Sequence, residues 1–219
     1  MIITIDGPAG SGKSSTARSL AKKLGFEYLR TGLMYRAVAL AGMRAHVDWN
    51  RPDELTEIAR KMALKLDGEF IFLEGENVTV EVETSEVTAV TRFSAENPDV
   101  REILTQMQRE YVRGKDCIAE GRDQGTVVFP EAELKLYLDA APEERAKRRV
   151  EQKRKAGEPA DYEAILVAIR RRDWEDSHRE IAPLACAPDA VRIVSDGLEL
   201  EQVVNQILEI VEKIRENVR

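Results

Sequence analysis

Hydrophobic and polar positions follow two patterns along the chain: short apolar runs, and longer segments with apolar residues three or four positions apart. The runs predict strands at residues 1–5, 26–29, 117–119, 134–138 and 191–194. The segments predict helices at about residues 13–24, 31–45, 53–66, 98–112, 142–149, 162–175 and 200–218. Strands that alternate with helices are typical of an α/β fold, here a five-stranded parallel sheet covered on both faces.

Two stretches depart from this alternation. Residues 69–73 and 78–82 each alternate between apolar and polar side chains, and a turn at 74–77 joins them. This pattern predicts an antiparallel hairpin, so we expect an inserted subdomain over about residues 67–92. Residues 153–159 are charged and contain Gly157, which predicts a mobile tip.

The first strand leads directly into residues 7–14, Gly-Pro-Ala-Gly-Ser-Gly-Lys-Ser. Their spacing is that of the P-loop motif G-x-x-x-x-G-K-S/T, in which backbone N–H groups and a helix N-terminus surround phosphate oxygens. Lys13 would reach the β- and γ-phosphates, and the Ser14 hydroxyl would bind Mg²⁺. A glycine-rich turn could match by accident, but the motif lies between a strand and a helix, as its mechanism requires. The chain is therefore predicted to bind a nucleoside triphosphate.

Composition and charge narrow the class of protein. The 219 residues include 40 acidic and 33 basic side chains, and the net charge of −7 favours neither nucleic acid nor an anionic membrane as a partner. No apolar run approaches the length of a membrane span, and the first strand is too short for a signal peptide, so we expect a cytoplasmic protein. Cys117 and Cys186, with His46 and His178, predict neither a disulfide framework nor a zinc site.

Arginine residues indicate the chemistry of a second substrate. Arg172, Asp176 and Arg179 fall on one face of a predicted helix, although a solvated face held by ion pairs would give the same pattern. Transfer to a phosphate acceptor gathers negative charge, which arginines stabilise. Further arginines occur at positions 36, 101, 122, 145, 148 and 149.

The chemical class of the acceptor follows from the same residues. A monoester phosphate is largely ionised near neutral pH and requires no general base. A hydroxyl acceptor would need a positioned carboxylate, for which Asp6, Glu120 and Asp123 are candidates. The large number of arginines among these polar residues favours a phosphate acceptor.

Several stretches together resemble the bacterial cytidylate kinases, which transfer the γ-phosphoryl group of ATP to CMP or dCMP. The P-loop is shared with many NTPases, whereas the run Gly-Arg-Asp-Gln-Gly-Thr-Val-Val-Phe-Pro at residues 121–130 is highly specific. The resemblance covers nearly the whole chain. The matching stretches are residues 3–15, 31–36, 98–101, 120–130, 142–146 and 172–184.

The resemblance implies a three-layer P-loop fold with three functional parts. Residues 1–30 and 114–219 would form the core, and residues 31–113 the acceptor-binding domain with a small antiparallel β insert at about 67–92. A helical lid would lie within the core at about 145–160. The resemblance also implies an ATP-dependent enzyme that uses Mg²⁺ and acts as a monomer, without nucleic acid or membrane as a partner.

By position, the resemblance also assigns residues to roles. Catalysis would involve Lys13, Arg122, Arg172 and Arg179. The ATP site would comprise Gly7, Pro8, Ala9, Gly10, Ser11, Gly12, Lys13, Ser14, Ser15, Arg145 and Arg149, with Ser14 as the ligand of Mg²⁺. The CMP site would comprise Thr31, Tyr35, Arg36, Arg101, Arg122, Asp123, Arg172, Asp176 and Arg179.

Two questions stay open at this point. Thr91, Arg92 and Ser94 compete for the place of the residue that reads the cytosine base, and Arg30 stands where the family commonly has Asp or Ser. The alternative functions are a P-loop kinase that acts on UMP, AMP or a hydroxyl acceptor, and a nucleotide-dependent switch. The chain lacks the N-K-x-D element by which a switch would read guanine.

Overall fold

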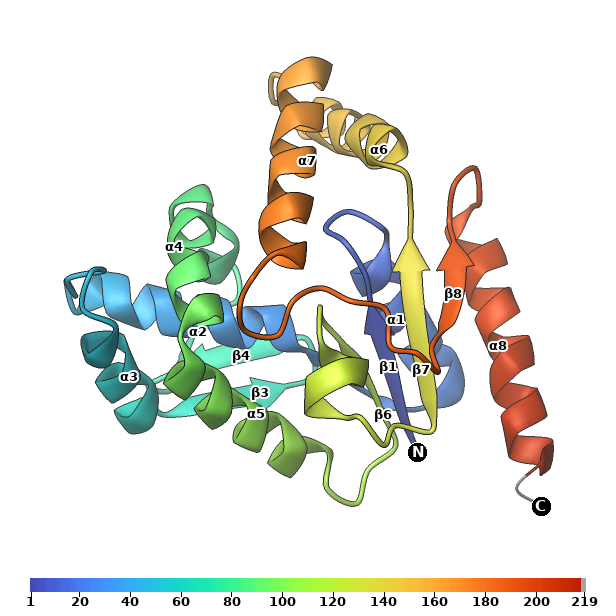
Figure 1. Cartoon of the computed structure of the whole chain (residues 1–219), viewed down its shortest axis with the longest axis horizontal. Coiled ribbons are helices and arrows are strands. Elements are labelled where there is room, and N and C mark those ends of the chain that lie inside the picture. Colours follow the sequence, from blue (N-terminus) through green and yellow to red (C-terminus); the bar gives the residue numbers. More distant parts are fainter. Residues whose placement is uncertain (218–219) are drawn as a thin grey trace. The chain divides into compact units, whose positions relative to one another are not determined.

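The computed structural model of the chain describes residues 1–217 (Figure 1). It divides into two compact units, one formed by Met1–Phe26 with Ile118–Arg219 and the other by Glu27–Cys117. The functional roles expected for the two parts of the chain, a P-loop core and an acceptor-binding domain, stay predictions.

A five-stranded sheet has the strand order β2-β6-β1-β7-β8. β1 pairs in parallel with β7, so that Ile3 lies opposite Leu134 and Ile5 opposite Leu136, and β7 pairs in parallel with β8. The expected α/β fold with a five-stranded sheet is confirmed. The strands are β1 (Ile2–Asp6), β2 (Glu27–Arg30), β6 (Cys117–Glu120), β7 (Leu134–Asp139) and β8 (Val191–Val194).

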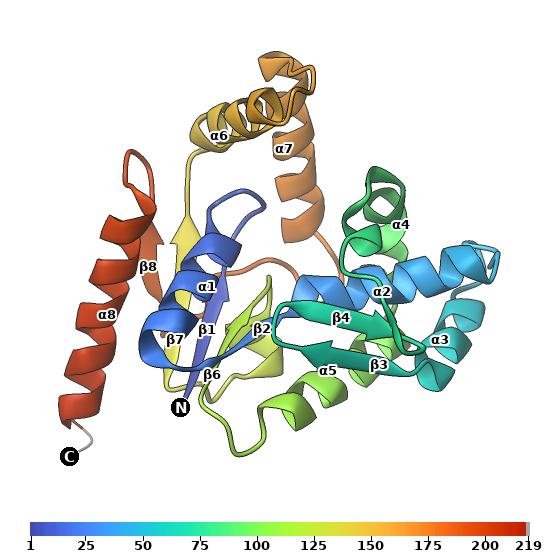
Figure 2. The ribbon, with the colours of Figure 1, turned by 180° about the vertical axis from the view of Figure 1, so that it is seen from behind.

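The central strands are buried on both faces, which explains why they are nearly continuous apolar runs. Ile3, Thr4 and Ile5 are successive residues of β1, point alternately to the two faces, and are each inaccessible to solvent. α1 packs against β1 and α8, and α6 packs against α7 (Figure 2). These helices are α1 (Lys13–Leu24), α6 (Pro142–Lys155), α7 (Tyr162–Ser177) and α8 (Leu200–Asn217).

Two helix boundaries in the first unit differ from the expected ones. α6 continues to Lys155, so helix occupies part of the stretch expected as a tip. α7 ends at Ser177, and the expectation that Arg179 shares a helical face with Arg172 and Asp176 is wrong for Arg179. The Ser177 hydroxyl donates to the carbonyl of Asp173, which offers the backbone a side-chain partner at the helix end. Residue 218, expected to end the last helix, lies outside the described residues.

The segment that follows β6 contains a short π-helix, Gln124–Val128, which the sequence pattern did not indicate. The Asp6 carboxylate at the end of β1 accepts the backbone N–H groups of Gln124 at 2.9 Å and Gly125 at 2.7 Å. These two bonds fix the start of the π-helix to the end of the central strand. Single π-helical turns frequently occur at functional sites.

The second unit contains a three-stranded antiparallel sheet and several helices. Its strands have the order β3-β4-β5, and β4 pairs with both neighbours. The strands are β3 (Leu64–Asp67), β4 (Phe70–Leu73) and β5 (Glu76–Asn77). The helices are α2 (Thr31–Arg44), α3 (Pro52–Lys61), the 3₁₀ turn η1 (Glu81–Glu83), α4 (Ser85–Glu96) and α5 (Pro98–Val112).

The insert exists, but its expected pairing is wrong. The predicted helix over residues 53–66 ends at Lys61, and residues 64–67 form β3, the main partner of β4. Leu64-Lys65-Leu66-Asp67 alternates with a period of two, and Gly68, with a φ of 56°, allows the turn into β4. Residues 78–82, expected as the second strand, instead lead into the 3₁₀ turn.

Helix α4 occupies a region that the sequence pattern predicted only as the end of the insert. Thr84 is its N-cap, with a side-chain oxygen that accepts the N–H of Val87. The buried Ser94 hydroxyl lies 2.8 Å from the carbonyl oxygen of Tyr35 and donates a hydrogen bond that ties α4 to α2.

The close approach of two central strands requires glycine at position 7. Gly7 follows β1 directly and has a φ of 145°. A Cβ atom at this position would lie 2.1 Å from the carbonyl oxygen of Leu138 in β7. No side chain tolerates such a contact without a shift of backbone, so the first glycine of the phosphate loop is also a packing requirement.

Replacement of Gly7 by Ala tests this requirement. We expect Gly7→Ala to lower the free energy of unfolding by about 3 kcal/mol, because backbone strain and an overpacked contact add. The matched control is Gly25→Ala at the end of α1, where φ is 69° but nothing lies within 4 Å. The Gly25→Ala variant has the backbone strain without the clash, so its free energy of unfolding should fall by about 1 kcal/mol. Urea denaturation followed by circular dichroism measures both, and equal losses would contradict the clash with Leu138.

Candidate active site

The phosphate loop, residues 7–14, joins the end of β1 to the start of α1. Gly10 and Gly12 have φ angles of 81° and 97°, in the left-handed region that glycine adopts without strain. Gly12 is the N-cap of α1, so the unpaired N–H groups and the positive dipole end of this helix face the loop. The loop therefore has the backbone geometry of an anion-binding site.

Lys13, the first residue of α1, is only 6% exposed, and its Nζ donates to the carbonyl oxygen of Pro8 at 2.7 Å. Burial lowers the pKa of Lys13 well below its usual value, and the Arg122 charge lowers it further, whereas Glu120 and Asp6 act in the opposite direction. A phosphate in the loop would supply the negative charge that stabilises the protonated ammonium.

Ser14 and Glu120 meet at the mouth of the loop. The Ser14 hydroxyl donates to both carboxylate oxygens of Glu120, at 2.8 and 2.9 Å. A hydroxyl and a carboxylate provide the hard oxygen ligands that Mg²⁺ prefers, and phosphates commonly supply part of its shell. The pair therefore fits this ion. Within residues 1–217, no group of three or more His, Cys, Asp and Glu side chains is arranged to hold a metal.

Asp6 is buried between the loop and the π-helix. Burial raises its pKa to about 6, although the two backbone hydrogen bonds from Gly125 and Gln124 act in the opposite direction. Both carboxylate oxygens accept backbone N–H groups, so Asp6 fixes the segment that begins with Arg122 and Asp123.

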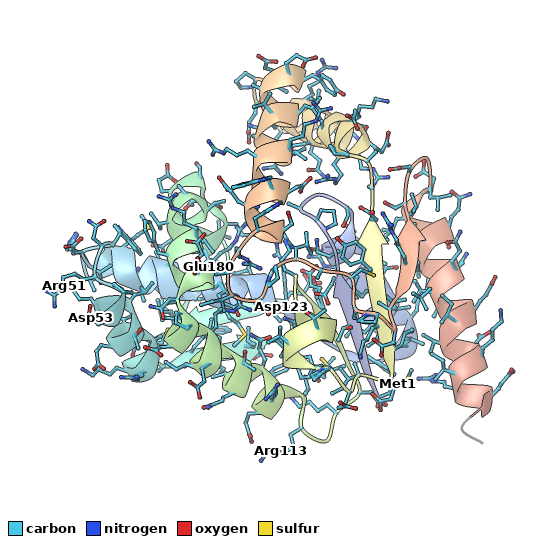
Figure 3. The ribbon with its side chains drawn as sticks, viewed as in Figure 1. Met1, Arg51, Asp53, Arg113, Asp123 and Glu180 are labelled. Atoms are coloured by element: carbon cyan, nitrogen blue, oxygen red, sulfur yellow. The ribbon has the colours of Figure 1, made fainter. Side chains whose placement is uncertain are left out.

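The segment after β6 presents two of the expected acceptor residues. Arg122 donates from Nε to Asp176 on α7 at 2.9 Å, and Asp123, labelled in Figure 3, is buried. Burial alone would raise the pKa of Asp176, but the Arg122 charge and hydrogen bond outweigh it and hold the pKa below its usual value. Asp176 is therefore ionised at neutral pH and holds Arg122 in place.

The other expected residues of this region lie at the end of α7. Arg172 is exposed and lies one helical turn before Asp176. Arg179 lies beyond the helix and donates from Nη2 to the carbonyl oxygen of Ala182 at 2.8 Å. The structure thus brings together Arg122 and Asp176, and places Arg172 on the same helix.

The two arginines of α6 expected at the ATP site differ in environment. Arg145 is buried and donates from Nη1 to the carbonyl oxygen of Ala9 in the phosphate loop at 3.0 Å. Its guanidinium also forms a bidentate pair with Asp173, which the sequence analysis missed and which only its position beside Arg172 could have suggested. Arg149 is exposed, and its Nη1 lies 3.4 Å from Gln152 Oε1 on the same helix.

In the second unit, α2 and α5 carry the remaining expected residues. Thr31 is the first residue of α2 and is buried, and Arg36 donates to the carbonyl oxygen of Val82 at 3.3 Å. Arg101 on α5 is 6% exposed, and its guanidinium carbon lies 5.3 Å from the centre of the Tyr35 ring. The structure therefore brings Tyr35 and Arg101 together, within the range of a cation–π contact.

The three candidates for reading the base lie on α4. Thr91 donates to the carbonyl oxygen of Val87 at 2.7 Å, and the Ser94 hydroxyl is buried against backbone. Arg92 is exposed, with its guanidinium carbon 4.8 Å from the Phe93 ring centre. Which of the three reads the base stays open.

None of the helices within residues 1–217 combines the length and the apolar character that a membrane crossing requires. Among solved structures, a shikimate kinase from Bacteroides thetaiotaomicron is similar to this chain with a TM-score of 0.50. It is 15% identical, and the comparison covers 97% of this chain and 98% of the other. This likeness shows the fold alone.

Comparison of sequences gives a closer relation. A model of the family described as Cytidylate kinase matches residues 3–213. The chain is 44% identical over 211 residues to the cytidylate kinase of Rhodopirellula baltica, which covers 96% of this chain and 92% of that protein. It is 42% identical to the cytidylate kinase of Caldanaerobacter subterraneus over 96% of this chain and 94% of that protein. The chain belongs to the cytidylate kinase family.

Proposed function

We propose that this protein transfers the γ-phosphoryl group of ATP to CMP or dCMP and releases ADP with CDP or dCDP. The observation that carries the proposal is the match to the cytidylate kinase family over residues 3–213. The phosphate loop, the buried Lys13 and the arginines of α7 supply the chemistry that this reaction requires.

The donor site is built on the phosphate loop. Residues 7–15 would surround the phosphates of ATP, Lys13 would hold the β- and γ-phosphates, and Arg145 and Arg149 would lie along the nucleotide. Ser14, with Glu120 beside it, would hold Mg²⁺, and this ion would neutralise part of the phosphate charge. Catalysis in this class is mostly alignment and charge stabilisation, since no covalent intermediate forms.

The residues to which we assign the acceptor role belong to α2 and α5 in the second unit, and to α7 and the segments that follow β6 and α7 in the first. Arginines would bind the phosphate of CMP, and Asp123 and Asp176 would accept hydrogen bonds from the sugar hydroxyls. The ionised acceptor phosphate would attack in line, while Arg122, Arg172 and Arg179 stabilise the charge that gathers in the transition state. The proposed acceptor residues are Thr31, Tyr35, Arg36, Arg101, Arg122, Asp123, Arg172, Asp176 and Arg179.

The proposal includes the setting of the reaction. We take the protein to act as a monomer in the cytoplasm, on nucleotides alone, without nucleic acid or membrane as a partner. The net charge of −7 supports the exclusion of polyanionic partners.

An acceptor panel tests the proposed reaction. ADP release from Mg-ATP is followed in a coupled assay with CMP, dCMP, UMP, AMP, GMP, shikimate or no acceptor. We expect turnover with CMP and dCMP well above the others, because the base and phosphate are read together. Equal release with every acceptor and with none would identify an ATPase instead.

Replacement of Lys13 tests the donor site. We expect Lys13→Ala to lower kcat/KM by about 100- to 1,000-fold or more, because an electrostatic donor to the transferring phosphoryl group is lost. The fold should remain intact, since the substitution also removes the cost of burying a charged ammonium. Lys23→Ala, at an exposed lysine of the same helix, is the control and should keep wild-type turnover. Wild-type activity in Lys13→Ala would remove Lys13 from the site.

Replacement of Arg101 tests the acceptor site. Loss of a charge-assisted contact of about 1.5–3 kcal/mol should raise the KM for CMP by roughly 10- to 100-fold in Arg101→Ala, with a smaller change in the KM for ATP. Arg113→Ala, at the exposed C-terminal end of α5, provides the control. Unchanged kcat and KM for CMP in Arg101→Ala would show that this arginine does not contact the acceptor.

A further inference from the structure

The Arg145 guanidinium joins three segments of the first unit. Its Nε donates to the carbonyl oxygen of Ala140, between β7 and α6, at 2.9 Å. Its Nη1 donates to the carbonyl oxygen of Ala9, inside the phosphate loop, at 3.0 Å. Nη1 and Nη2 together contact the two carboxylate oxygens of Asp173 on α7, at 2.9 and 2.5 Å. One side chain therefore connects the loop, the start of α6 and the C-terminal part of α7.

The charge of Arg145 makes this connection specific. The side chain is 2% exposed, and a guanidinium in such a place requires a paired anion, which Asp173 provides in the fork-to-fork geometry. The planar fork fixes the directions of the bonds as well as their number. A displacement of the Ala9 carbonyl or of Asp173 therefore shifts the position in which the Arg145 guanidinium can make all of its hydrogen bonds.

Helix α7 has a second ionic anchor three residues further on. Asp176 pairs with Arg122 at 2.9 Å, in the segment that follows β6. Asp173 and Asp176 lie three residues apart and so share one side of the helix. The first anchor leads to the phosphate loop, and the second belongs to the proposed acceptor site.

We propose that Asp173 is a positioning residue that couples ATP in the phosphate loop to CMP beside α7, acting through Arg145. The proposal rests on the proposed function. ATP in the loop fixes the Ala9 carbonyl, Arg145 transmits this constraint to Asp173, and α7 then presents Arg172 and Asp176 to CMP. Because coupling between two ligands is reciprocal, CMP strengthens the binding of ATP by the same factor.

The test compares Asp173→Asn with a matched variant, Glu143→Gln. Glu143 pairs with Arg170 at 2.5 Å and so also joins α6 to α7, but through two exposed side chains and no residue of the loop. Isothermal titration calorimetry on the whole protein gives the CMP affinity with and without saturating Mg²⁺ and β,γ-methylene-ATP. The reverse titration, with the analogue into protein with and without CMP, measures the same coupling from the other side.

In the wild-type protein we expect the analogue to tighten CMP binding by about 5-fold or more. Asp173→Asn should reduce this factor to less than about 2-fold, because the amide can neither neutralise the Arg145 guanidinium nor accept two hydrogen bonds from it. Glu143→Gln should keep the wild-type factor, since an exposed ion pair contributes little. A wild-type factor in Asp173→Asn, or no coupling in the wild-type protein, would overturn the proposal.

A second variant keeps the test decisive if Asp173→Asn does not fold. Arg145→Lys retains the charge beside Asp173 but cannot reach Ala9, Ala140 and Asp173 together, so it should lose the coupling in the same way. Retention of the wild-type coupling factor in Arg145→Lys would count against the proposal.

A fluorescence readout separates this proposal from the proposed function. Trp174 follows Asp173 on α7, is 62% exposed and stacks on His178 with ring centres 4.7 Å apart. In a Trp49→Phe background, the analogue alone should change Trp174 emission in the parent protein and not in the Asp173→Asn variant. No response in the parent, or an equal response in both, would refute the link. A protein that binds no CMP refutes the proposed function, while this readout still decides the link.

Discussion

The burial of charge at the carboxyl ends of the central strands is the constraint on which the rest of the structure depends. Asp6 and Arg145 are both nearly inaccessible to solvent; Asp6 accepts two backbone N–H groups, and Arg145 donates to three residues. Lys13 differs, because the hydrogen bond of its ammonium goes to a neutral carbonyl and its pKa is lowered. This arrangement makes a bound phosphate the natural completion of the site, since it adds the negative charge that a buried ammonium needs.

Arginines of α2 and its N-cap form the ion pairs that join this helix to the chain at β5 and η1. Arg30 pairs with Glu83, and Arg44 pairs with Glu76 and Glu81. Two of these carboxylates, Glu81 and Glu83, belong to η1, which packs against α2 where a second strand was expected. Val82 is buried and Val80 is 84% exposed, as in a turn that is anchored on one side.

Local signals predicted much of the fold and the phosphate loop. α1 begins at Lys13, after its N-cap Gly12, and ends before Gly25, and α5 begins at Pro98, because caps and proline act within a few residues. The predicted pairing within the β insert was wrong because Leu64 and Leu66 fit the pattern of either a helix or a strand. Tertiary pairing decides between the two. The role of Asp173 could not be predicted for the same reason, since its partner Arg145 lies 28 residues away in the sequence.

The balance of charge in the proposed acceptor site follows from the ion pair between Arg122 and Asp176. Because its pKa is lowered, Asp176 stays ionised and offsets one of the three arginines at positions 122, 172 and 179. The proposed acceptor site also contains Arg36 and Arg101, so positive charge remains in excess to bind a monoester phosphate, which carries about −1.5 to −2 at neutral pH. The aspartate therefore reduces the excess of positive charge in the proposed site and holds Arg122 in position.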